Sequence, residues 1–282
     1  MRVTIRSLSE ADLDSADAIL QSGFGSSGRF KDEVRRYLLI QPDGWLIATL
    51  DDQPVGMVGA VDYGAFAYIG LMAVRAEAQR RGIGLTLMQH LLRWLDARGC
   101  PIGLLDATEA GARLYARLGF VEDGRTHQFV QAGRLQSVYP MERVSLLRPE
   151  DIAAVAEFDA PIFGAERARV FRAYLTELRD RAFVVRSTAG RIAGYLFAQR
   201  RKLGPWAAHS TEDAAALLGA ALSLSYEDPP NVSLPASNLG GTDLLLRSGF
   251  QQQRSLRHMR RGELQRRGRS DLLYGLASFA IG

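Results

Sequence analysis

Cysteine is almost absent from this chain of 282 residues, in which Cys100 is the only one. A single cysteine cannot form an intramolecular disulfide, and it cannot supply the cluster of thiolates that structural zinc and iron–sulfur sites require. The 4 histidines are scattered without the spacing of metal ligands, so we expect no metal site. These shortages are typical of a protein from a reducing cytoplasm.

Long hydrophobic runs are missing as well. No apolar stretch approaches the roughly 18 residues that a membrane span needs, and the first residues do not combine a basic segment with an apolar one. We therefore expect a cytoplasmic protein that is neither exported nor bound to a membrane.

Neither sign of charge dominates the chain. Lys and Arg number 35 and Asp and Glu number 31, which gives a formal net charge of +4. This balance does not indicate a nucleic-acid partner, although the preference for arginine over lysine favours local binding of anions. Residues 254–269 are densely basic, but they contain little aromatic character and no nucleic-acid motif. We interpret that run as a solvated face and keep an acidic partner or RNA as the alternative.

The predicted order of elements occurs twice along the chain. With 47% of its residues hydrophobic, the chain is long enough for one large core or two ordinary domains. The hairpin expected at residues 45–62 returns at 182–195, and the strand, helix and strand expected at 102–120 return at 231–250. We therefore predict an α/β (α+β) protein made of two duplicated units.

The boundary between these units is expected between Gln136 and Arg148. We accordingly assign residues 1–140 to the first domain and residues 141–282 to the second. The first domain contains the segments with a recognisable chemical pattern.

One such segment follows a strand predicted at residues 66–74 and opens a helix. It reads Gln79-Arg80-Arg81-Gly82-Ile83-Gly84. The N–H groups of such a loop can converge on an anion at the helix N-terminus, and the two glycines permit close approach. A Walker loop would need Gly-Lys-Ser/Thr, and a dinucleotide fingerprint would need a third glycine where Leu87 stands. The pattern therefore predicts a pyrophosphate cradle of another kind.

A second segment runs from Thr108 to Phe120 and reads Thr-Glu-Ala-Gly-Ala-Arg-Leu-Tyr-Ala-Arg-Leu-Gly-Phe. In this order the two segments resemble the GNAT acetyltransferase superfamily. The acyl-CoA motif of that family is Gln/Arg-x-x-Gly-x-Gly/Ala after the fourth strand. Its later motif is Asn-x-x-Ala-x-x-Leu-Tyr-x-x-x-Gly-Phe, in which Thr108 here replaces Asn and Gly111 replaces Ala.

The resemblance implies two tandem domains, each with a mixed, mostly antiparallel twisted sheet flanked by helices. It implies acetyl-CoA as co-substrate, with the pantetheine arm along the fourth strand, whose backbone N–H groups would stabilise the oxyanion. Tyr115 would give a proton to the leaving thiolate. The residues expected to bind acetyl-CoA are Met72, Ala73, Val74, Gln79, Arg80, Arg81, Gly82, Ile83, Gly84, Leu85, Thr86 and Thr108.

The motifs do not mark a general base, because the predicted fourth strand has no carboxylate. Asp62, Tyr63 and Asp106 are the neighbouring candidates. Asp106 ends the strand after the cofactor helix, where it would either face the amine channel or cap the next helix. Asp62 would serve either as a base or only to solvate a strand end. We select Tyr115 and Asp106 as the catalytic residues.

The second unit lacks a pair of glycines at the corresponding place, and Leu245 stands where Tyr115 stands in the first. It resembles the degenerate C-terminal half of bacterial tandem GNAT proteins, which implies one competent site per chain and a second domain that serves as scaffold and as part of the acceptor site. The expected reaction is transfer of an acetyl group to the primary amine of a small or amino-acid-like molecule. The alternatives are a protein or peptide N-acetyltransferase and a non-catalytic acyl-CoA sensor.

Overall fold

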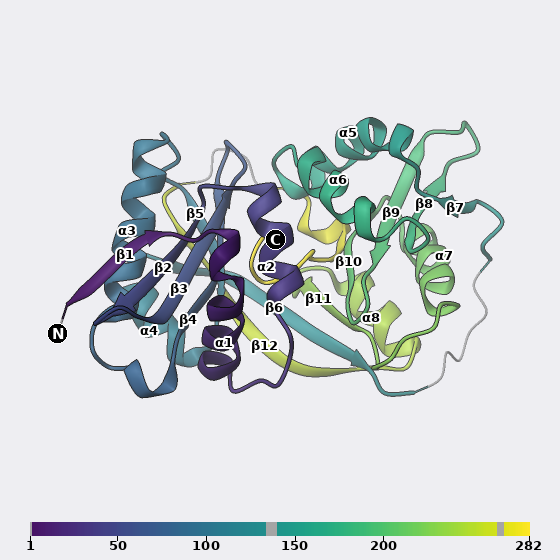
Figure 1. Cartoon of the computed structure of the whole chain (residues 1–282). Helices are drawn as coiled ribbons and strands as arrows, with labels where there is room; N and C mark the ends of the chain where they lie inside the picture. The colour runs from purple at the N-terminus through teal and green to yellow at the C-terminus, as the bar shows by residue number, and fades with distance from the viewer. Residues whose placement is uncertain (1, 134–139, 264–267) are drawn as a thin grey trace.

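The structure is a computed structural model that describes residues 2–133, 140–263 and 268–282. Two halves lie side by side, and the end of the chain lies at the centre between them (Figure 1). Part of the predicted boundary segment, 136–139, and part of the basic run, 264–267, lie outside the described residues.

The first half has the order of elements that the sequence predicts: a strand, two helices, a hairpin, and then strand, helix, strand, helix, strand. Apolar residues at helical spacing bury one face of its longest helix against the sheet. The elements are β1 (Val3–Ser7), a 3-10 turn (Glu10–Asp12), α1 (Leu13–Phe24), α2 (Lys31–Ile40), β2 (Trp45–Leu50), β3 (Gln53–Asp62), β4 (Ala67–Val74), a 3-10 turn (Ala76–Ala78), α3 (Ile83–Ala97), β5 (Gly103–Ala107), α4 (Glu109–Ala116) and β6 (Val121–Gln131).

The second half repeats this order and adds one short strand, which confirms the duplication. Its elements are β7 (Val144–Leu146), a 3-10 turn (Pro149–Asp151), α5 (Ile152–Phe163), α6 (Ala168–Glu177), β8 (Ala182–Arg186), β9 (Ile192–Ala198), β10 (Leu203–Ala208), α7 (Thr211–Leu222), β11 (Asn231–Pro235), α8 (Leu239–Arg247), β12 (Phe250–Arg261), a 3-10 turn (Ser270–Leu272) and β13 (Leu273–Gly275). Even the helix caps correspond, since Thr108 caps α4 and Asn238 caps α8 through the same side-chain contact three residues on.

The two halves exchange strands. One sheet has the order β1-β2-β3-β4-β5-β12-β6-β11, and the other has the order β13-β10-β9-β8-β7. The long strand β12 of the second half thus lies between β5 and β6 of the first, with Met259 opposite Leu105. In return β6 pairs with β11, with Phe129 opposite Val232. Both long strands pass from one half to the other in Figure 1. Among the named strands that the structure describes, β4 and β5 form the parallel pair and all other pairs are antiparallel.

Each face of the large sheet has its own core. Leu87, Leu91 and Leu95 of α3 pack with β4 and β5 on one face. On the other face α1 and α2 share a core with α5 and α6, in which Tyr37 of the first half and Tyr174 of the second are both fully buried. This shared core holds the two halves together.

The last residues of the chain belong to that shared core. The Tyr63 hydroxyl donates to the Ile281 carbonyl at 2.6 Å. A Cβ atom at Gly70 of β4 would lie 2.1 Å from the Cα atom of Ala280. Glycine at position 70 therefore allows the final segment to lie directly on β4.

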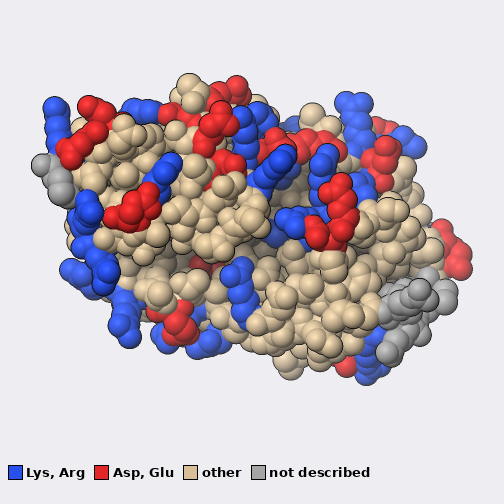
Figure 2. All heavy atoms as spheres, turned by 60° about the horizontal axis from the view of Figure 1, so that its bottom comes forward, with Lys and Arg blue, Asp and Glu red and all other residues tan. Residues whose placement is uncertain are grey.

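Charge is distributed without a dominant sign on the face drawn in Figure 2, where acidic and basic side chains are interspersed. Within the described parts of the chain, none of the helices combines the length and the apolar character needed to cross a bilayer.

Candidate active site

The fourth strand separates from the fifth where the cofactor arm is expected. β4 and β5 are paired through Ala67 and Tyr68 of β4, and no later residue of β4 has a partner on β5. Further along, β4 contains a bulge in which Leu71, at φ 51, and Met72 together face Val58 of β3. The bulge turns the backbone at the point where the strands part, which leaves an edge of β4 that an extended ligand can pair with.

After β4 and the short 3-10 turn that follows it, the chain reaches the N-terminus of α3. Gly82 is its N-cap with φ 81, and no side chain caps the helix. The first intrahelical bond is donated by the N–H of Thr86 to the Gly82 carbonyl at 3.0 Å. The N–H groups of Ile83, Gly84 and Leu85 therefore have no acceptor within the helix and can bind an anion.

The two glycines of this loop differ in backbone conformation and in surroundings. A Cβ atom at Gly82 would meet nothing within 4 Å, so glycine is needed there for its positive φ. A Cβ atom at Gly84 would lie 2.8 Å from the Cε atom of Met72, so the end of this flexible side chain would have to move to make room for it. Arg80 and Arg81 are exposed, and neither has an ion-pair partner in the described chain. Gln79 ties the loop to β4 by donating to the Val74 carbonyl at 3.1 Å.

Tyr115 lies on α4, on the same face of the sheet as α3. Its side chain is 8% exposed and packs edge-on against Phe120. Burial raises the pKa of Tyr115, so the phenol stays protonated at neutral pH. No hydrogen bond of its hydroxyl is found among the described residues, and burial alone accounts for the shift of its pKa. Gly111 leaves space for the ring, because a Cβ atom there would lie 3.3 Å from Cε2 of Tyr115.

Asp106 lies on β5 and faces the opposite side of the sheet. Its side chain is fully buried. The carboxylate accepts hydrogen bonds from the Tyr68 hydroxyl and from the Thr126 hydroxyl at 2.6 Å, and Nδ1 of His258 lies 3.2 Å from Oδ1. The expected alternative that Asp106 caps α4 is wrong, because the cap is the Thr108 hydroxyl, which accepts the Gly111 N–H at 3.1 Å.

A cavity of about 620 Å³ opens beside Asp106, between the two halves. Tyr68, Leu104 and His258 line it from the large sheet. Phe163 and Leu276 close it from the second half. The cavity is therefore a composite of both halves, with an apolar wall and a polar cluster at the sheet.

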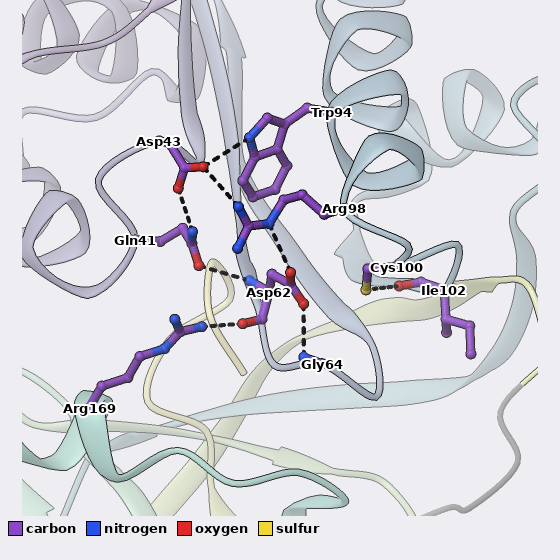
Figure 3. Close-up of polar contacts among 9 residues, drawn as sticks. All are labelled: Gln41, Asp43, Asp62, Gly64, Trp94, Arg98, Cys100, Ile102 and Arg169. Carbon is purple, nitrogen blue, oxygen red and sulfur yellow. Dashed lines mark hydrogen bonds and ion pairs between the residues drawn. The ribbon is translucent and has the colours of Figure 1, made fainter.

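Asp62 and Tyr63, the other candidate bases, are held in structural contacts. In Figure 3 the Asp62 carboxylate lies between Arg98 and Gly64, whose Nε and N–H donate to it at 2.9 Å and 2.8 Å. Burial opposes ionisation of Asp62, but these two donors outweigh it and hold the pKa of Asp62 below its ordinary value. The backbone carbonyl of the same residue accepts from Arg169 of the second half. The Tyr63 hydroxyl is engaged in its hydrogen bond to the Ile281 carbonyl.

The equivalent place in the second half is filled by the chain itself. β13 pairs with β10, with Gly275 opposite Trp206, and the Leu276 N–H donates to the Ser233 carbonyl of β11 at 2.7 Å. The short strand thus occupies the gap between β10 and β11 that corresponds to the gap between β4 and β5. The N-terminus of α7 is capped by Ser210, whose hydroxyl accepts the Asp213 N–H at 3.1 Å.

Sequence reasoning did not place His258 beside Asp106. It lies on β12, and its nearness to Asp106 arises only from the exchanged strand, on which the two residues are register partners. No local pattern in the sequence carries this information. Among the described residues, no three His, Cys, Asp or Glu side chains are grouped so that they could hold a metal ion.

Comparison with known proteins identifies the family to which this chain belongs. Residues 13–120 match the model of the acetyltransferase (GNAT) family, and residues 155–275 match a second model, an acetyltransferase (GNAT) domain. The holothin acyltransferase of Pseudoalteromonas sp. (strain SANK 73390) is 26% identical over 256 residues, which cover 89% of this chain and 85% of the relative. N-acetyltransferase YitH of Bacillus subtilis (strain 168), whose activity is uncharacterised, is 23% identical over 70% of both chains.

Solved structures with a similar fold include acetyltransferases. A Pyrococcus horikoshii protein assigned as an acetyltransferase has a TM-score of 0.87 and 29% identity, over 99% of this chain and 96% of that one. A GCN5-related N-acetyltransferase from Sphaerobacter thermophilus has the same fold, with a TM-score of 0.67, 15% identity, and coverage of 94% and 96%. The fold and the site define an acyltransferase. The chain belongs to the GNAT acetyltransferase family and contains two such domains in tandem.

Proposed function

We propose that this protein transfers the acetyl group of acetyl-CoA to the primary amine of a small molecule. The observation that carries the proposal is the parting of β4 from β5, with Tyr115 under one face of the sheet and Asp106 at a cavity on the other. A thioester placed in this gap would meet a proton donor on one side and an incoming amine on the other.

The first half has groups that fit acetyl-CoA. The unpaired edge of β4 at Met72 to Val74 suits the amides of the pantetheine arm. The uncapped N-terminus of α3, flanked by Arg80 and Arg81, suits the pyrophosphate. GNAT proteins as a family use acetyl-CoA, and the unpaired strand edge and the uncapped helix N-terminus support the same co-substrate for this chain.

In the proposed reaction the amine nitrogen attacks the thioester carbonyl carbon. Negative charge then develops on the carbonyl oxygen, where backbone N–H groups of the β4 bulge near Met72 would stabilise it. As the carbon–sulfur bond breaks, the thiolate takes a proton from the Tyr115 hydroxyl. The amine loses its proton on the side of the sheet where Asp106 lies.

A small acceptor is favoured over a peptide because residues of both halves line the cavity and narrow the space beside the sheet. Phe163 of α5 and Leu276, which follows β13, line the cavity together with Tyr68 of β4 and Leu104 of β5, where a peptide would need an open groove. The similar Pseudoalteromonas protein is named for one acceptor, holothin. The proposal includes neither a nucleic-acid nor a membrane partner.

The test is release of free CoA from acetyl-CoA by the purified chain, with a panel of small amines and a panel of peptides. The expected result is CoA release with a subset of small amines, together with an acetylated amine detected by mass spectrometry. Faster turnover of peptides would identify a peptide acetyltransferase. Tight binding of acetyl-CoA with no transfer to any amine or peptide would identify a sensor.

A further inference from the structure

The cavity beside the gap between β4 and β5 has an apolar interior. Two charged side chains of its lining, Glu122 and Arg125, are exposed and mark its entrance. Its volume of about 620 Å³ lies within the range of about 300–1,000 Å³ that is typical of pockets for small molecules. The apolar side chains of the lining are buried, none of them more than 9% exposed: Phe66, Leu104, Ile162, Phe163, Leu273 and Leu276.

This interior adjoins the place where the thioester is proposed to lie. Tyr68 and Leu104 are register partners at the last paired position of β4 and β5, and both line the cavity. An acceptor whose amine reaches the gap therefore has the rest of its body against the apolar wall.

The ring of Phe163 is a fixed part of that wall. It packs edge-on against Tyr63, with ring centroids 5.0 Å apart, and its centroid lies 5.4 Å from that of Phe66. The guanidinium of Arg167 lies 3.8 Å from the Phe163 centroid and is itself held by a buried ion pair with Asp159 at 2.7 Å. A ring that is already ordered loses little entropy when a ligand packs against it.

The entrance has acidic groups, but they are paired. Glu122 forms ion pairs with Arg125 at 3.4 Å and with Arg257 at 3.2 Å. Asp123 forms one with Arg260 at 3.3 Å. The field of a paired carboxylate is largely cancelled by its partner, and solvent screens the remainder. These groups therefore give little attraction for a second positive charge on an acceptor.

We propose that the acceptor is a primary amine carried on an apolar, aromatic body, and that Phe163 determines this specificity. The inference rests on the proposed function and names the class of acceptor for the same site. The rings of Phe66, Tyr68 and Phe163 suit the faces and edges of an aromatic ligand. Burial of apolar surface favours binding in proportion to the area removed from water. A diamine would place a second ammonium in the apolar interior, which is unfavourable without a partner.

The first test uses the unaltered protein, acetyl-CoA and five primary amines: butylamine, hexylamine, phenethylamine, ethanolamine and putrescine. We expect kcat/KM to rise by about fourfold for each methylene added between butylamine and hexylamine. Phenethylamine should exceed ethanolamine by about tenfold or more, because its ring is buried. Equal values for phenethylamine and ethanolamine, or faster transfer to putrescine than to phenethylamine, would overturn the proposal.

The second test separates the role of Phe163 from a general effect on the fold. Phe163→Leu should raise KM for phenethylamine by about tenfold and change KM for ethanolamine by less than about twofold, since only the first amine packs against the ring. Phe158→Leu is the matched control on the same helix and should keep the wild-type preference. Phe158 is half-buried, packs edge-on against Tyr195, and is not among the described residues that line the cavity.

An equal effect of Phe163→Leu on both amines would contradict the assignment of specificity to this ring. Thermal unfolding of each variant shows whether a loss of activity is a loss of fold. Leu276→Ala removes apolar surface from the same wall and is the second variant, in which the preference for phenethylamine over ethanolamine should also decrease.

The third test does not depend on transfer. Calorimetry of phenethylamine binding to the protein with CoA present should show a negative heat-capacity change, which accompanies burial of apolar surface, and weaker binding to Phe163→Leu. Such binding without transfer to any amine would contradict the proposed function and leave the apolar specificity standing. Transfer that favours ethanolamine or putrescine would contradict the apolar specificity and leave the proposed function standing. Neither binding nor transfer would overturn both.

Discussion

Tyr115 and Asp106 lie at the same gap in the sheet but on opposite faces. Tyr115 is in the core formed by α3 and α4, whereas Asp106 follows the alternation of β5 with Leu104, which lies in the core of the other face. In the proposed reaction the sheet would thus separate Tyr115, the proton donor to the leaving sulfur, from the face on which the amine loses its proton. Burial raises the pKa of Tyr115, so the phenol on its side of the sheet stays protonated at neutral pH.

At the scale of the residue, Tyr115→Phe should slow turnover by roughly 10²-fold or more, because the thiolate loses its positioned proton donor. Affinity for acetyl-CoA should be retained, since the ring still packs against Phe120. Steady-state kinetics under conditions in which chemistry limits the rate, together with calorimetry, would measure both quantities.

The sign of the pH effect adds a second readout. Because burial raises the pKa of Tyr115, the phenol stays a donor throughout the neutral range, and no fall in activity from its ionisation is expected below about pH 10. Equal turnover by the wild type and Tyr115→Phe would assign this residue to packing alone.

The sequence predicted those parts of the candidate site that lie within one short segment of the chain. The loop with Gly82 and Gly84 and the helix with Tyr115 are local features, and both lie where expected. The pair of His258 and Asp106 is separated by 152 positions and is created by strand pairing. Contacts of that kind leave no trace in composition or spacing.

At the scale of the element, β13 explains why the second half differs from the first. It fills the gap between β10 and β11 with a strand of this chain, where the first half leaves the edge of β4 unpaired with β5. Leu245 is fully buried at the position equivalent to Tyr115. A strand of only three residues gives no periodicity, so the sequence predicted the missing motif in this half but not the segment that fills the space.

We therefore expect one equivalent of acetyl-CoA per chain. Arg81→Ala should weaken that single binding event by about 1–3 kcal/mol if its guanidinium contacts a phosphate. Arg172→Ala, at an exposed position of α6, is the matched control and should bind like the wild type. Isothermal titration calorimetry measures both stoichiometry and affinity. Two tight equivalents, or equal affinity in Arg81→Ala, would show that the phosphate cradle is misplaced.

At the scale of the whole molecule, the order of elements was predictable and the exchange of strands was not. The alternation of apolar and polar residues along a strand depends on which face is buried, and it does not depend on which strand lies alongside. A strand that pairs within its own half therefore cannot be told by its sequence from one that pairs with the other half. The long strands β6 and β12 of the large sheet, with 11 and 12 residues, are the examples, because each pairs with strands of the other half.

A chain that ends at Arg143 should be poorly soluble. It would keep β5 and β6 but lose β12, which lies between them, and β11, which pairs with the far edge of β6. Unpaired edges of this length favour association with other chains. Size-exclusion chromatography and thermal unfolding would test this expectation. A monomeric fragment with full stability and unchanged acceptor preference would show that the first half folds by itself.

The exchanged strand also governs the order of events while the protein is being made. A ribosome releases the first half before the second, yet β5 cannot pair with β12 on its second edge until residues 257–261 have emerged. The nascent first half must therefore wait, with an open sheet edge, for more than a hundred further residues. A tandem protein whose domains closed separately would have no such interval, so this fold links the appearance of a working site to completion of nearly the entire polypeptide.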